Sequence, residues 1–439
     1  MKILVIGSGG REHALIWKIA QSPKVKHIYA APGNAGIASL AECVPVPVDE
    51  IKKLASFALS KSIDLTLVGP ELPLTLGIVD EFKRYGLKIC GPDRTAARIE
   101  GSKLFAKDLM KKYRVPTADY AAFESPSEAA AYIRGKGIPA VIKADGLAAG
   151  KGVMPVHSLE EAEKAIDTIL TRKEFGAAGS RIVIEDFLRG EEASFIAFTD
   201  GKTILPMPST QDHKAIYDGD KGPNTGGMGA YSPAPVITEK LARRIMDEVM
   251  TPVVKGMAAE GSPFKGILYA GMMIEGDAIR VLEFNARSGD PETQPIMMRM
   301  KSDIIPVLEA IADGKLDGTA VTWDERPAVC IVMASEGYPG NYRKGMAIEG
   351  LTEAQSLPDV QVFHAGTSLD GNRVVVNGGR VLGVTALGGT IEKAIERAYD
   401  AAARIRWDGV YYRKDIGRKA LNRMKQIPNP KSEAQNKSK

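Results

Sequence analysis

One short stretch, residues 280–294, mixes charged and apolar side chains in a way that could support chemistry. Because side chains alternate along a strand, Val281, Glu283 and Asn285 should share one face, with the residues between them on the other. An ionised glutamate on a largely buried strand is costly unless a positive group meets it. Glutamate and asparagine at this spacing offer two hard oxygen ligands, which suits Mg²⁺ held jointly with a nucleotide's phosphates.

A turn follows this strand and carries two more charged side chains. Arg287 and Asp290 lie in the run Asn-Ala-Arg-Ser-Gly-Asp-Pro, which can face the same cavity as Glu283. A solvated edge strand would explain an isolated Glu-x-Asn pattern, but these neighbours argue against it. We interpret the whole stretch as part of an active site.

Composition limits the possible classes of protein. The chain has 439 residues, 44% of them hydrophobic, which implies large cores and two to four domains. A net charge of +4 with 26% charged residues does not indicate a nucleic-acid binder. The scattered Cys43, Cys90 and Cys330 favour a reducing compartment, and no apolar stretch approaches membrane-spanning length. We expect a cytoplasmic protein that binds neither nucleic acid nor membranes.

The first hundred residues alternate between strand and helix patterns, which is typical of a parallel sheet covered on both faces. Strands are expected at 3–6, 28–31, 65–68 and 88–90, and helices at 11–21, 51–61 and 78–85. Ligands bind at the carboxyl ends of such strands. The turns that follow the strands should therefore rim one pocket: 7–10, 32–34, 69–71 and 91–93.

The first of these turns resembles the dinucleotide fingerprint G-x-G-x-x-G, but Glu12 stands at its sixth position. A nicotinamide enzyme also needs an acidic residue after the second strand, and residues 29–33 contain none. The turn is better interpreted as backbone N–H groups and a helix N-terminus that bind a plain phosphate. A nicotinamide-dependent oxidoreductase and a merely tight turn are the two alternatives.

A glycine-rich hairpin occupies residues 140–156. Its glycine spacing differs from that of a Walker loop, and a strand rather than a helix follows. Lys143 ends an apolar strand, and Lys151 lies between Gly150 and Gly152. The pattern favours a flap over phosphates rather than a solvated hairpin.

Two further segments could contact a nucleotide. An apolar strand ends in Glu185 and Asp186 and continues through Leu188, a crossover whose backbone could bind an adenine, with Glu192 available for ribose hydroxyls. The run 211–214 leads into a second glycine-rich segment at 218–230, which we interpret as a loop too polar to pack. Long ordered loops in compact domains are usually functional.

The remaining chain predicts a C-terminal α+β domain. Strands are expected at 328–334, 360–364, 373–376 and 380–386, and a helix at 391–405. Residues 425–439 are nearly all polar with two prolines, which predicts a disordered tail.

Several motifs occur together in one order, at residues 7–13, 31–36, 143–152, 190–194, 211–214, 218–229 and 289–294. With them the sequence resembles the phosphoribosylamine–glycine ligase family, a purine-pathway branch of the ATP-grasp superfamily. The resemblance extends from Met1 to about Ala420. It implies an ATP-grasp fold, α/β and α+β and multidomain, with an N-terminal Rossmann-like domain and a C-terminal α+β domain. The implied boundaries are 1–100 for the N-terminal domain on the phosphoribosylamine side, 101–325 for the ATP-grasp region with a mobile lid at about 120–188, 326–424 for the C-terminal domain and 425–439 for the tail.

The resemblance implies ATP-dependent ligation of glycine to 5-phosphoribosylamine, giving glycinamide ribonucleotide, ADP and phosphate through a glycyl phosphate. Glycine's carboxylate would be the nucleophile, so no Ser, Cys or His triad is needed, and none is visible. Catalysis would rest on positioning and charge stabilisation. Another ATP-grasp carboxylate–amine ligase is the alternative. A monomer is favoured, with the oligomeric state left open.

The resemblance and the residue chemistry together assign the site residues. The candidate catalytic residues are Lys143, Asp212 and Arg287, the last two for glycine's amine and carboxylate. ATP would be bound by Lys103, Lys143, Gly150, Lys151, Gly152, Glu185, Asp186, Leu188 and Glu192. The other substrates would be bound by Gly9, Gly10, Arg11, Glu12, Pro32, Gly33, Asn34, Gly69, Pro70, Glu71, Asp212, Lys214, Arg287, Gly289 and Asp290. Glu283 and Asn285 would hold Mg²⁺ or Mn²⁺, with ATP as co-substrate.

Two positions depart from the family pattern. Ser288 stands where the family usually has phenylalanine, and Ala215-Ile216 stands where an arginine commonly follows the Gln-Asp-His-Lys run. The first affects packing beside Arg287, and the second removes a charge near the acceptor site.

Overall fold

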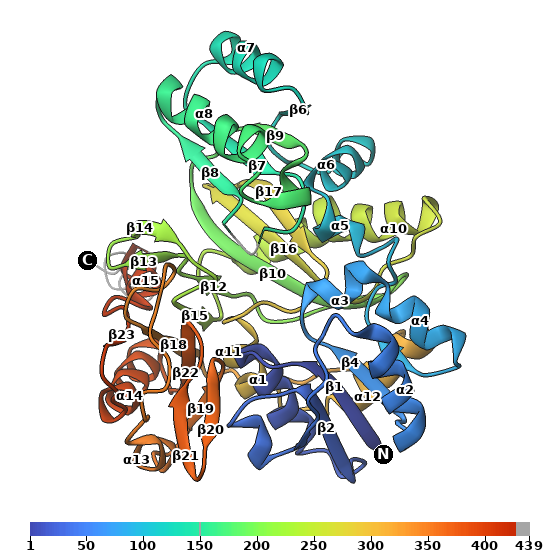
Figure 1. Ribbon diagram of the computed structural model, residues 1–439, viewed down its shortest axis with the longest axis vertical. Coiled ribbons are helices and arrows are strands. Elements are labelled where there is room, and N and C mark those ends of the chain that lie inside the picture. The colour runs from blue at the N-terminus through green and yellow to red at the C-terminus, as the bar shows by residue number, and fades with distance from the viewer. Residues whose placement is uncertain (149–150, 427–439) are drawn as a thin grey trace, which may run out of the picture.

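The computed structural model describes residues 1–148 and 151–426. Its N-terminal part is a five-stranded parallel sheet in the order β3-β2-β1-β4-β5, which confirms the expected architecture (Figure 1). The strands are β1 (Lys2–Gly7), β2 (His27–Pro32), β3 (Glu42–Cys43), β4 (Leu65–Val68) and β5 (Ile89–Cys90). The helices are α1 (Gly10–Ile19), η1 (Ile37–Ser39), α2 (Ile51–Lys61), α3 (Glu71–Leu76) and α4 (Ile78–Arg84). Helix α3 is an addition to the expected elements.

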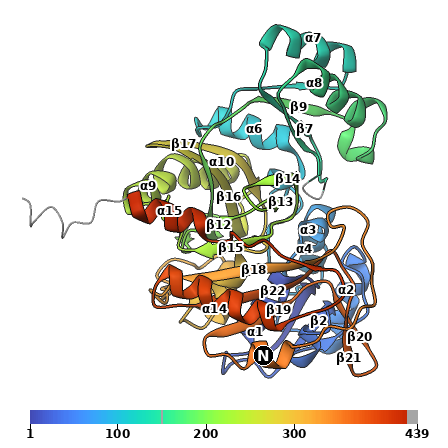
Figure 2. The same ribbon diagram turned by 90° about the vertical axis from the view of Figure 1, so that its left-hand side faces the viewer.

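Two short helices, α5 (Arg98–Gly101) and α6 (Lys103–Lys112), lead to a small four-stranded sheet, here called the lid sheet. Its order is β6-β9-β7-β8, from β6 (Tyr120–Phe123), β7 (Ala140–Ala144), β8 (Val153–Val156) and β9 (Ile182–Asp186). Helices α7 (Pro126–Lys136) and α8 (Leu159–Ile166), the π-helix η2 (Asp167–Thr171) and the 3₁₀-helix η3 (Gly176–Gly179) accompany it. The lid sheet has its own apolar core and projects from the rest of the molecule (Figures 1 and 2).

A second four-stranded sheet, here called the grasp sheet, has the order β11-β10-β16-β17. Its strands are β10 (Glu191–Asp200), β11 (Ile204–Pro206), β16 (Lys265–Glu275) and β17 (Ala278–Asn285). The helices of this region are α9 (Glu239–Ile245), η4 (Met246–Met250), α10 (Thr251–Ala259), α11 (Thr293–Arg299) and α12 (Ile305–Asp313).

The C-terminal sheet contains β12-β15-β18-β22-β19, with β23 paired to β18 (Figure 1). Its strands are β12 (Gln211–Asp212), β15 (Gly229–Ser232), β18 (Ala328–Ser335), β19 (Val360–His364), β22 (Arg380–Leu387) and β23 (Val410–Tyr411). Two hairpins, β13 (Ala215–Tyr217) with β14 (Lys221–Asn224) and β20 (Thr367–Asp370) with β21 (Arg373–Val376), flank it. The helices are α13 (Leu351–Gln355), α14 (Ile391–Arg404) and α15 (Arg418–Gln426).

The segment 211–230 is more ordered than the sequence predicts. It forms four short strands, and Ala230 and Tyr231 are fully buried. The expectation of a loop too polar to pack is wrong, because β15 pairs with β18, a strand about a hundred residues further along the chain. The predicted tail at 425–439 lies almost wholly outside the described residues.

Strand β17 contains a β-bulge that changes which side chains reach the cavity. Adjacent residues of β16 pair with Val281 and Glu283, so Leu282 is the extra residue. Val281 and Phe284 are buried in the same core, whereas Glu283 and Asn285 line the cavity. The expectation that Val281 shares a face with the two polar residues is therefore wrong, because the extra residue reverses the alternation.

Among the described residues, no helix is both long enough and apolar enough to cross a lipid bilayer.

Candidate active site

A cavity of about 460 Å³ lies where the lid sheet, the grasp sheet and loops of the N- and C-terminal parts meet. Thirteen of the predicted site residues line it, although they come from widely separated elements. They are Arg11, Glu71, Lys103, Lys143, Gly152, Glu185, Glu192, Asp212, Lys214, Glu283, Asn285, Arg287 and Asp290.

One side of the cavity holds what we call the lysine cluster: Lys103, Lys107, Lys143, Glu185 and Glu283. Glu185 bridges two of the lysines, with Oε1 2.9 Å from Nζ of Lys143 and Oε2 2.8 Å from Nζ of Lys107. All three side chains are buried. A single carboxylate between two ammonium groups leaves positive charge at this surface, which suits anionic phosphates.

Glu283 reaches the cavity from β17 and, within the described part of the chain, makes no side-chain hydrogen bond or ion pair. Burial alone would raise the pKa of Glu283. The nearby cations Lys214, Lys103, Lys143 and Arg287 outweigh burial and lower that pKa to about 2. The carboxylate is therefore ionised at neutral pH, and its oxygens are available to a ligand.

The other side holds the arginine cluster, which consists of Arg11, Arg287, Arg380, Glu71, Glu100 and Asp290. Nη2 of Arg287 lies 3.0 Å from Oε1 of Glu100, and its Nε lies 3.3 Å from Oε2 of Glu71. Arg287 also donates to Oδ1 of Asn285 and to its neighbour's carbonyl. These contacts use most of its five N–H donors. Burial raises the pKa of Glu100, and the charge of Arg287 opposes that rise.

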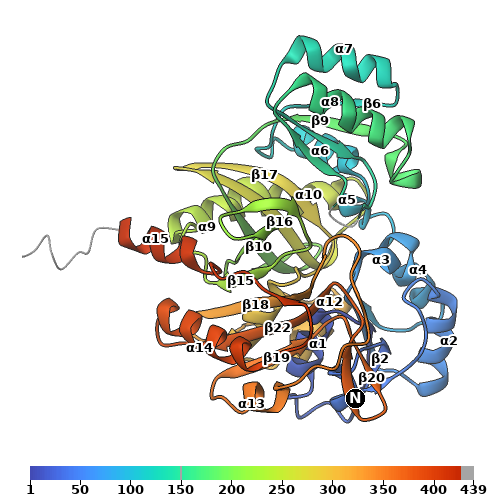
Figure 3. The same cartoon turned by 60° about the vertical axis from the view of Figure 1, so that its left-hand side comes forward.

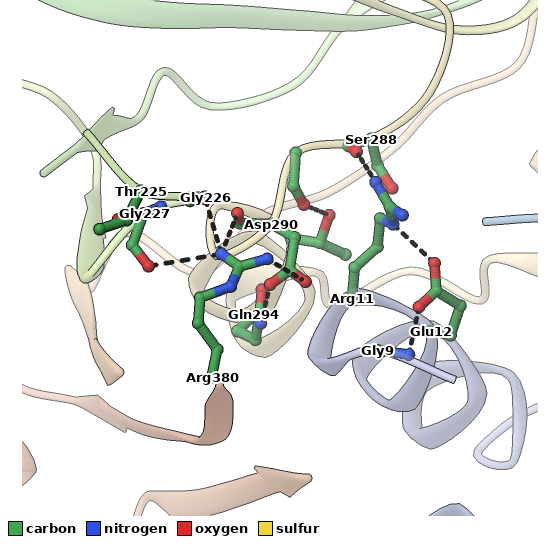
Figure 4. A network of polar contacts seen from close by, with 12 residues as sticks. Gly9, Arg11, Glu12, Thr225, Gly226, Gly227, Ser288, Asp290, Gln294 and Arg380 are labelled. Atoms are coloured by element: carbon green, nitrogen blue, oxygen red, sulfur yellow. Dashed lines mark hydrogen bonds and ion pairs between the residues drawn. The ribbon is translucent and has the colours of Figure 1, made fainter. Parts of the chain in front are cut away.

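Arg380 joins this cluster from the C-terminal sheet (Figure 4). Its Nη2 lies 3.0 Å from Oδ2 of Asp290, and its Nη1 donates to the carbonyls of Gly226 and Asp290 at 2.6 and 2.7 Å. Gln294 donates to the other carboxylate oxygen of Asp290 at 2.8 Å. Asp290 is thus held from two directions, by β22 and by α11.

Arg11 is oriented by its own helix and by the turn after β17 (Figure 4). Its Nε lies 2.6 Å from Oε1 of Glu12, and its Nη1 donates to the carbonyl of Ser288 at 3.0 Å. Oε2 of Glu12 accepts the N–H of Gly9 at 2.6 Å. Gly69, in the turn after β4, lies against Glu12. A Cβ at position 69 would lie 2.1 Å from Oε1 of Glu12, so this position requires glycine while Glu12 stays in place. Glu12 holds Arg11 in place and does not itself line the cavity.

Asp212 and Lys214 bring a third group of charges to the cavity from β12 and the residues after it. Nζ of Lys214 lies 2.8 Å from Oε2 of Glu192. Burial raises the pKa of Asp212 to about 7; Lys214 opposes this rise, and Glu292 and Glu192 add to it. Asp212 can therefore exchange a proton near neutral pH.

The turn after β2 lies away from the cavity lining. Nδ2 of Asn34 donates to the carbonyls of Ser8 and His364, both at 2.8 Å, and its Oδ1 accepts two N–H groups of its own turn. Asn34 thereby ties the N-terminal sheet to the end of β19. Its neighbours Pro32 and Gly33 likewise do not line the cavity.

The structure also leaves several other predicted residues outside the lining. Asp186 forms an ion pair with Lys136, and its N–H donates to the carbonyl of Asp119. Gly150 lies outside the described residues. The remaining residues in this group are Gly9, Gly10, Gly69, Pro70, Lys151, Leu188 and Gly289.

Several polar lining residues were not singled out from the sequence, among them Glu100, Lys107, Tyr269, Glu292 and Arg380. Glu292 lies within the motif at 289–294, so the sequence did offer a signal from which it could have been predicted. Its Oε1 accepts from Ser194, whose hydroxyl also lies 2.8 Å from that of Tyr269. Nothing local marks Lys107 or Arg380, because their partners are distant in sequence.

The lid sheet and the grasp sheet, with a cavity of lysines and carboxylates between them, define the ATP-grasp class. The 2-oxoglutarate carboxylase biotin carboxylase domain of Hydrogenobacter thermophilus has the same fold at 16% identity, with a TM-score of 0.71 over 94% of this chain and 91% of that one.

Three family descriptions match in order: "Phosphoribosylglycinamide synthetase, N domain" at residues 1–100, "ATP-grasp (A) domain" at 101–293 and "C domain" at 328–419. The chain belongs to the phosphoribosylglycinamide synthetase family. It is 55% identical to the phosphoribosylamine–glycine ligase of Yersinia pestis, over 97% of this chain and 100% of that protein. It is 54% identical to the phosphoribosylamine–glycine ligase of Pseudomonas aeruginosa, over 96% of this chain and 99% of that protein. The crystal structure of the Thermotoga maritima phosphoribosylamine–glycine ligase has a TM-score of 0.82 at 33% identity, covering 95% of this chain and all of that one.

Proposed function

We propose that this enzyme joins glycine to 5-phosphoribosylamine at the expense of ATP, giving glycinamide ribonucleotide, ADP and phosphate in purine biosynthesis. Membership of the family supports this reaction. The observation that carries it is Glu283, an ionised carboxylate with open oxygens that faces a cavity rich in lysine. That combination suits a polyanionic nucleotide bound together with a cation.

The reaction would take two steps. An oxygen of glycine's carboxylate attacks the γ-phosphorus of ATP, an O–P bond forms, and the bond to the β,γ-bridging oxygen breaks to release ADP. The amine of phosphoribosylamine then attacks the carbonyl carbon of glycyl phosphate, and phosphate leaves as the C–N bond forms. The attacking nitrogen loses a proton in this second step.

The residues of the chain would act by binding and positioning. Lys143 and Lys103 would contact the phosphates, and Arg287 would offer its remaining N–H donor to glycine's carboxylate. Asp212 would accept a hydrogen bond from glycine's amine. Covering the cavity with the lid sheet would exclude water, which would otherwise hydrolyse the acyl phosphate.

The residues present fit a divalent cation. Glu283 and Asn285 present two oxygen donors to the cavity, and no cluster of three His, Cys, Asp or Glu side chains occurs in residues 1–148 and 151–426. Mg²⁺ commonly takes one or two carboxylates and leaves its other positions to water and phosphate oxygens. We propose that these two residues hold Mg²⁺, with Mn²⁺ as a substitute. When bound, the ion neutralises charge on the β- and γ-phosphate oxygens.

Omitting one substrate at a time from an assay of ADP release tests the overall reaction. ADP should form only when ATP, glycine and phosphoribosylamine are all present, apart from slow uncoupled hydrolysis. A panel of other carboxylates and amines separates this function from another ATP-grasp carboxylate–amine ligase. Efficient turnover of a different pair would contradict the proposal.

Glycine labelled with ¹⁸O in its carboxylate tests the intermediate. If glycyl phosphate forms, one labelled oxygen per turnover should appear in inorganic phosphate. Unlabelled phosphate would exclude it.

We also propose that the protein is cytoplasmic and monomeric. Its domains would end at residues 100, 325 and 424. Sedimentation velocity tests the monomer, and limited proteolysis tests the boundaries.

A further inference from the structure

A second cavity, of about 510 Å³, lies beside the candidate active site. Helix α15, the start of β10 and the β13–β14 hairpin surround it, and Figure 3 shows α15 between the grasp sheet and the C-terminal sheet. Four of its lining residues are exposed, namely Gly190, Asp220, Asn224 and Asn422. The cavity therefore opens to solvent on a side that the proposed reaction does not use.

The two cavities share a wall. Glu192, Asp212, Lys214 and Asn224 line both of them. The ion pair between Lys214 and Glu192, 2.8 Å long, stands between the two spaces, and its side chains are 30% and 41% exposed. A pair with this much solvent contact contributes little stability and can separate at small cost. The wall can therefore open without disturbing the core.

The charges around the second cavity nearly balance. Its carboxylates are those of Glu191, Glu192, Asp212 and Asp220, and its cations are Lys214, Lys419 and Arg423. Nη1 of Arg423 lies 2.5 Å from Oε1 of Glu191, and Nζ of Lys419 lies 2.7 Å from Oδ2 of Asp220. Four carboxylates against three cations leave a slight excess of negative charge, which does not favour a nucleotide or a sugar phosphate. A small zwitterion, with one ammonium and one carboxylate group, matches such a surface.

We propose that the second cavity is the passage by which the amino-acid substrate reaches the active site after ATP has bound. This rests on the proposed function, in which the nucleotide occupies the space between the lid sheet and β17. ATP there obstructs the large cavity from the lid side. The second cavity leads instead to Asp212, the group proposed to contact the amine of glycine.

A removable plug tests the passage. Asn422→Cys places a thiol in the lining, whereas Met424→Cys places one on the same helix at a residue that is 45% exposed and outside the lining. Both changes are made with Cys43→Ser, because Cys43 is exposed while Cys90 and Cys330 are buried. A bulky aromatic methanethiosulfonate is attached to each protein and later removed with dithiothreitol.

Plugging at position 422 should lower kcat/KM for glycine by about tenfold or more, because access then limits binding. The KM values for ATP and phosphoribosylamine should stay unchanged, the labelled Met424→Cys protein should match its unlabelled form, and dithiothreitol should restore activity. Unchanged glycine kinetics in the plugged protein would overturn the proposal, as would an equal loss in the Met424→Cys control.

A third result would overturn it in another way. In this result, plugging lowers kcat, leaves kcat/KM for glycine unchanged and changes product inhibition by phosphate. The second cavity would then serve the release of phosphate instead of the entry of glycine. Failure of the proposed function would be distinguishable, because the unlabelled proteins would then show no glycine-dependent release of ADP.

Discussion

The lysine cluster and the arginine cluster line the same cavity, but they balance their charges differently. In the lysine cluster, Glu185 is shared by Lys107 and Lys143, and Glu283 forms no ion pair with any residue that the structure describes. In the arginine cluster, Arg287 pairs directly with two carboxylates and Arg380 with one.

This difference in charge balance indicates that the lysine cluster is a binding surface and that the arginine cluster is a junction between domains. Positive charge remains on the lysine side, where the proposed ligand carries several negative charges. On the arginine side the protein supplies the counter-charges itself: Glu71 and Glu100 come from α3 and α5, whereas Arg287 follows β17 and Arg380 lies on β22. Changes in the lysine cluster should affect catalysis most, whereas changes in the arginine cluster should cause the larger losses of stability.

The largest effect is expected for Glu283→Gln, which keeps the shape of the side chain but removes its charge. Turnover should fall by about two to three orders of magnitude, because the pre-positioned charge that holds the nucleotide's cation is lost. The urea midpoint should also fall, because nearby cations lower the pKa of Glu283 to about 2 and its charge therefore stabilises the folded state at neutral pH. Steady-state ADP release and urea unfolding measure the two effects.

Glu275→Gln is the matched control, because Glu275 is an exposed glutamate at the end of neighbouring β16. Its activity should equal that of the unchanged protein. Retention of full turnover by Glu283→Gln would remove the contrast between the clusters.

Arg287→Met should lower stability in addition to weakening the proposed contact with glycine's carboxylate. It leaves Glu100 buried without its partner, and breaking a buried pair in this way costs about 3–5 kcal/mol. The double variant Arg287→Met/Glu100→Gln should recover part of the loss, since the stranded charge is gone. Urea unfolding measures both proteins.

Arg326→Met is the control, because Arg326 pairs with Asp324 and is 42% exposed. It should cost about 1 kcal/mol or less. An equally small cost at Arg287 would mean that its pairs do not hold the junction together.

Asp212 provides a test by pH. Burial raises the pKa of Asp212 to about 7, so the carboxylate that accepts from glycine's amine forms as pH rises through that value. Activity limited by this form should increase up to about tenfold per pH unit on the acid side and then level off. Asp212→Asn should remove this limb from the pH profile of kcat/KM for glycine. A limb that persists in the variant would assign it to another group.

The smallest effect is expected at the junction between the N- and C-terminal parts. Burial and the nearby His364 lower the pKa of His13 to about 3, and its Nδ1 accepts the backbone N–H of His364 at 2.7 Å. Because this folded-state pKa lies below the unfolded value of about 6.5, stability is lost as pH falls from about 6.5 toward about 3.

Each pH unit within that window should cost at most about 1.4 kcal/mol for His13. His13→Leu should reduce the difference between urea midpoints at pH 5.5 and 7.5. An unchanged difference would place the acid sensitivity elsewhere, for example at His213, whose pKa burial lowers to about 4.

Much of the fold could be predicted because the signals are local. Apolar runs bounded by glycine and proline turns placed β4 and β19 at their observed bounds, and helix periodicity placed α2 at its own. The segment 211–230 could not be predicted as strands. Its short polar pieces have no strand preference of their own, and β15 becomes a strand by pairing with β18.

In the candidate site, too, residues with local sequence signals were predicted, and residues whose partners are distant in the sequence were missed. Glu283, Asn285 and Lys143 were predicted because each lies in a motif whose residue types suit phosphate and metal chemistry. Lys107 was missed because its partner Glu185 is far along the chain. Arg380 was missed for the same reason.

The sequence by itself determined the alternating N-terminal sheet, the hairpin strands β7 and β8, and the hard oxygen donors that Glu283 and Asn285 offer. These depend on side-chain alternation, turn residues and ligand hardness, which act over a few neighbouring residues. Only the tertiary structure decided which way Glu283 points, because the bulge at Leu282 reflects its pairing with β16. It also decided that Asn34 ties β2 to β19 instead of lining the cavity, since its partner His364 lies 330 residues away in the sequence.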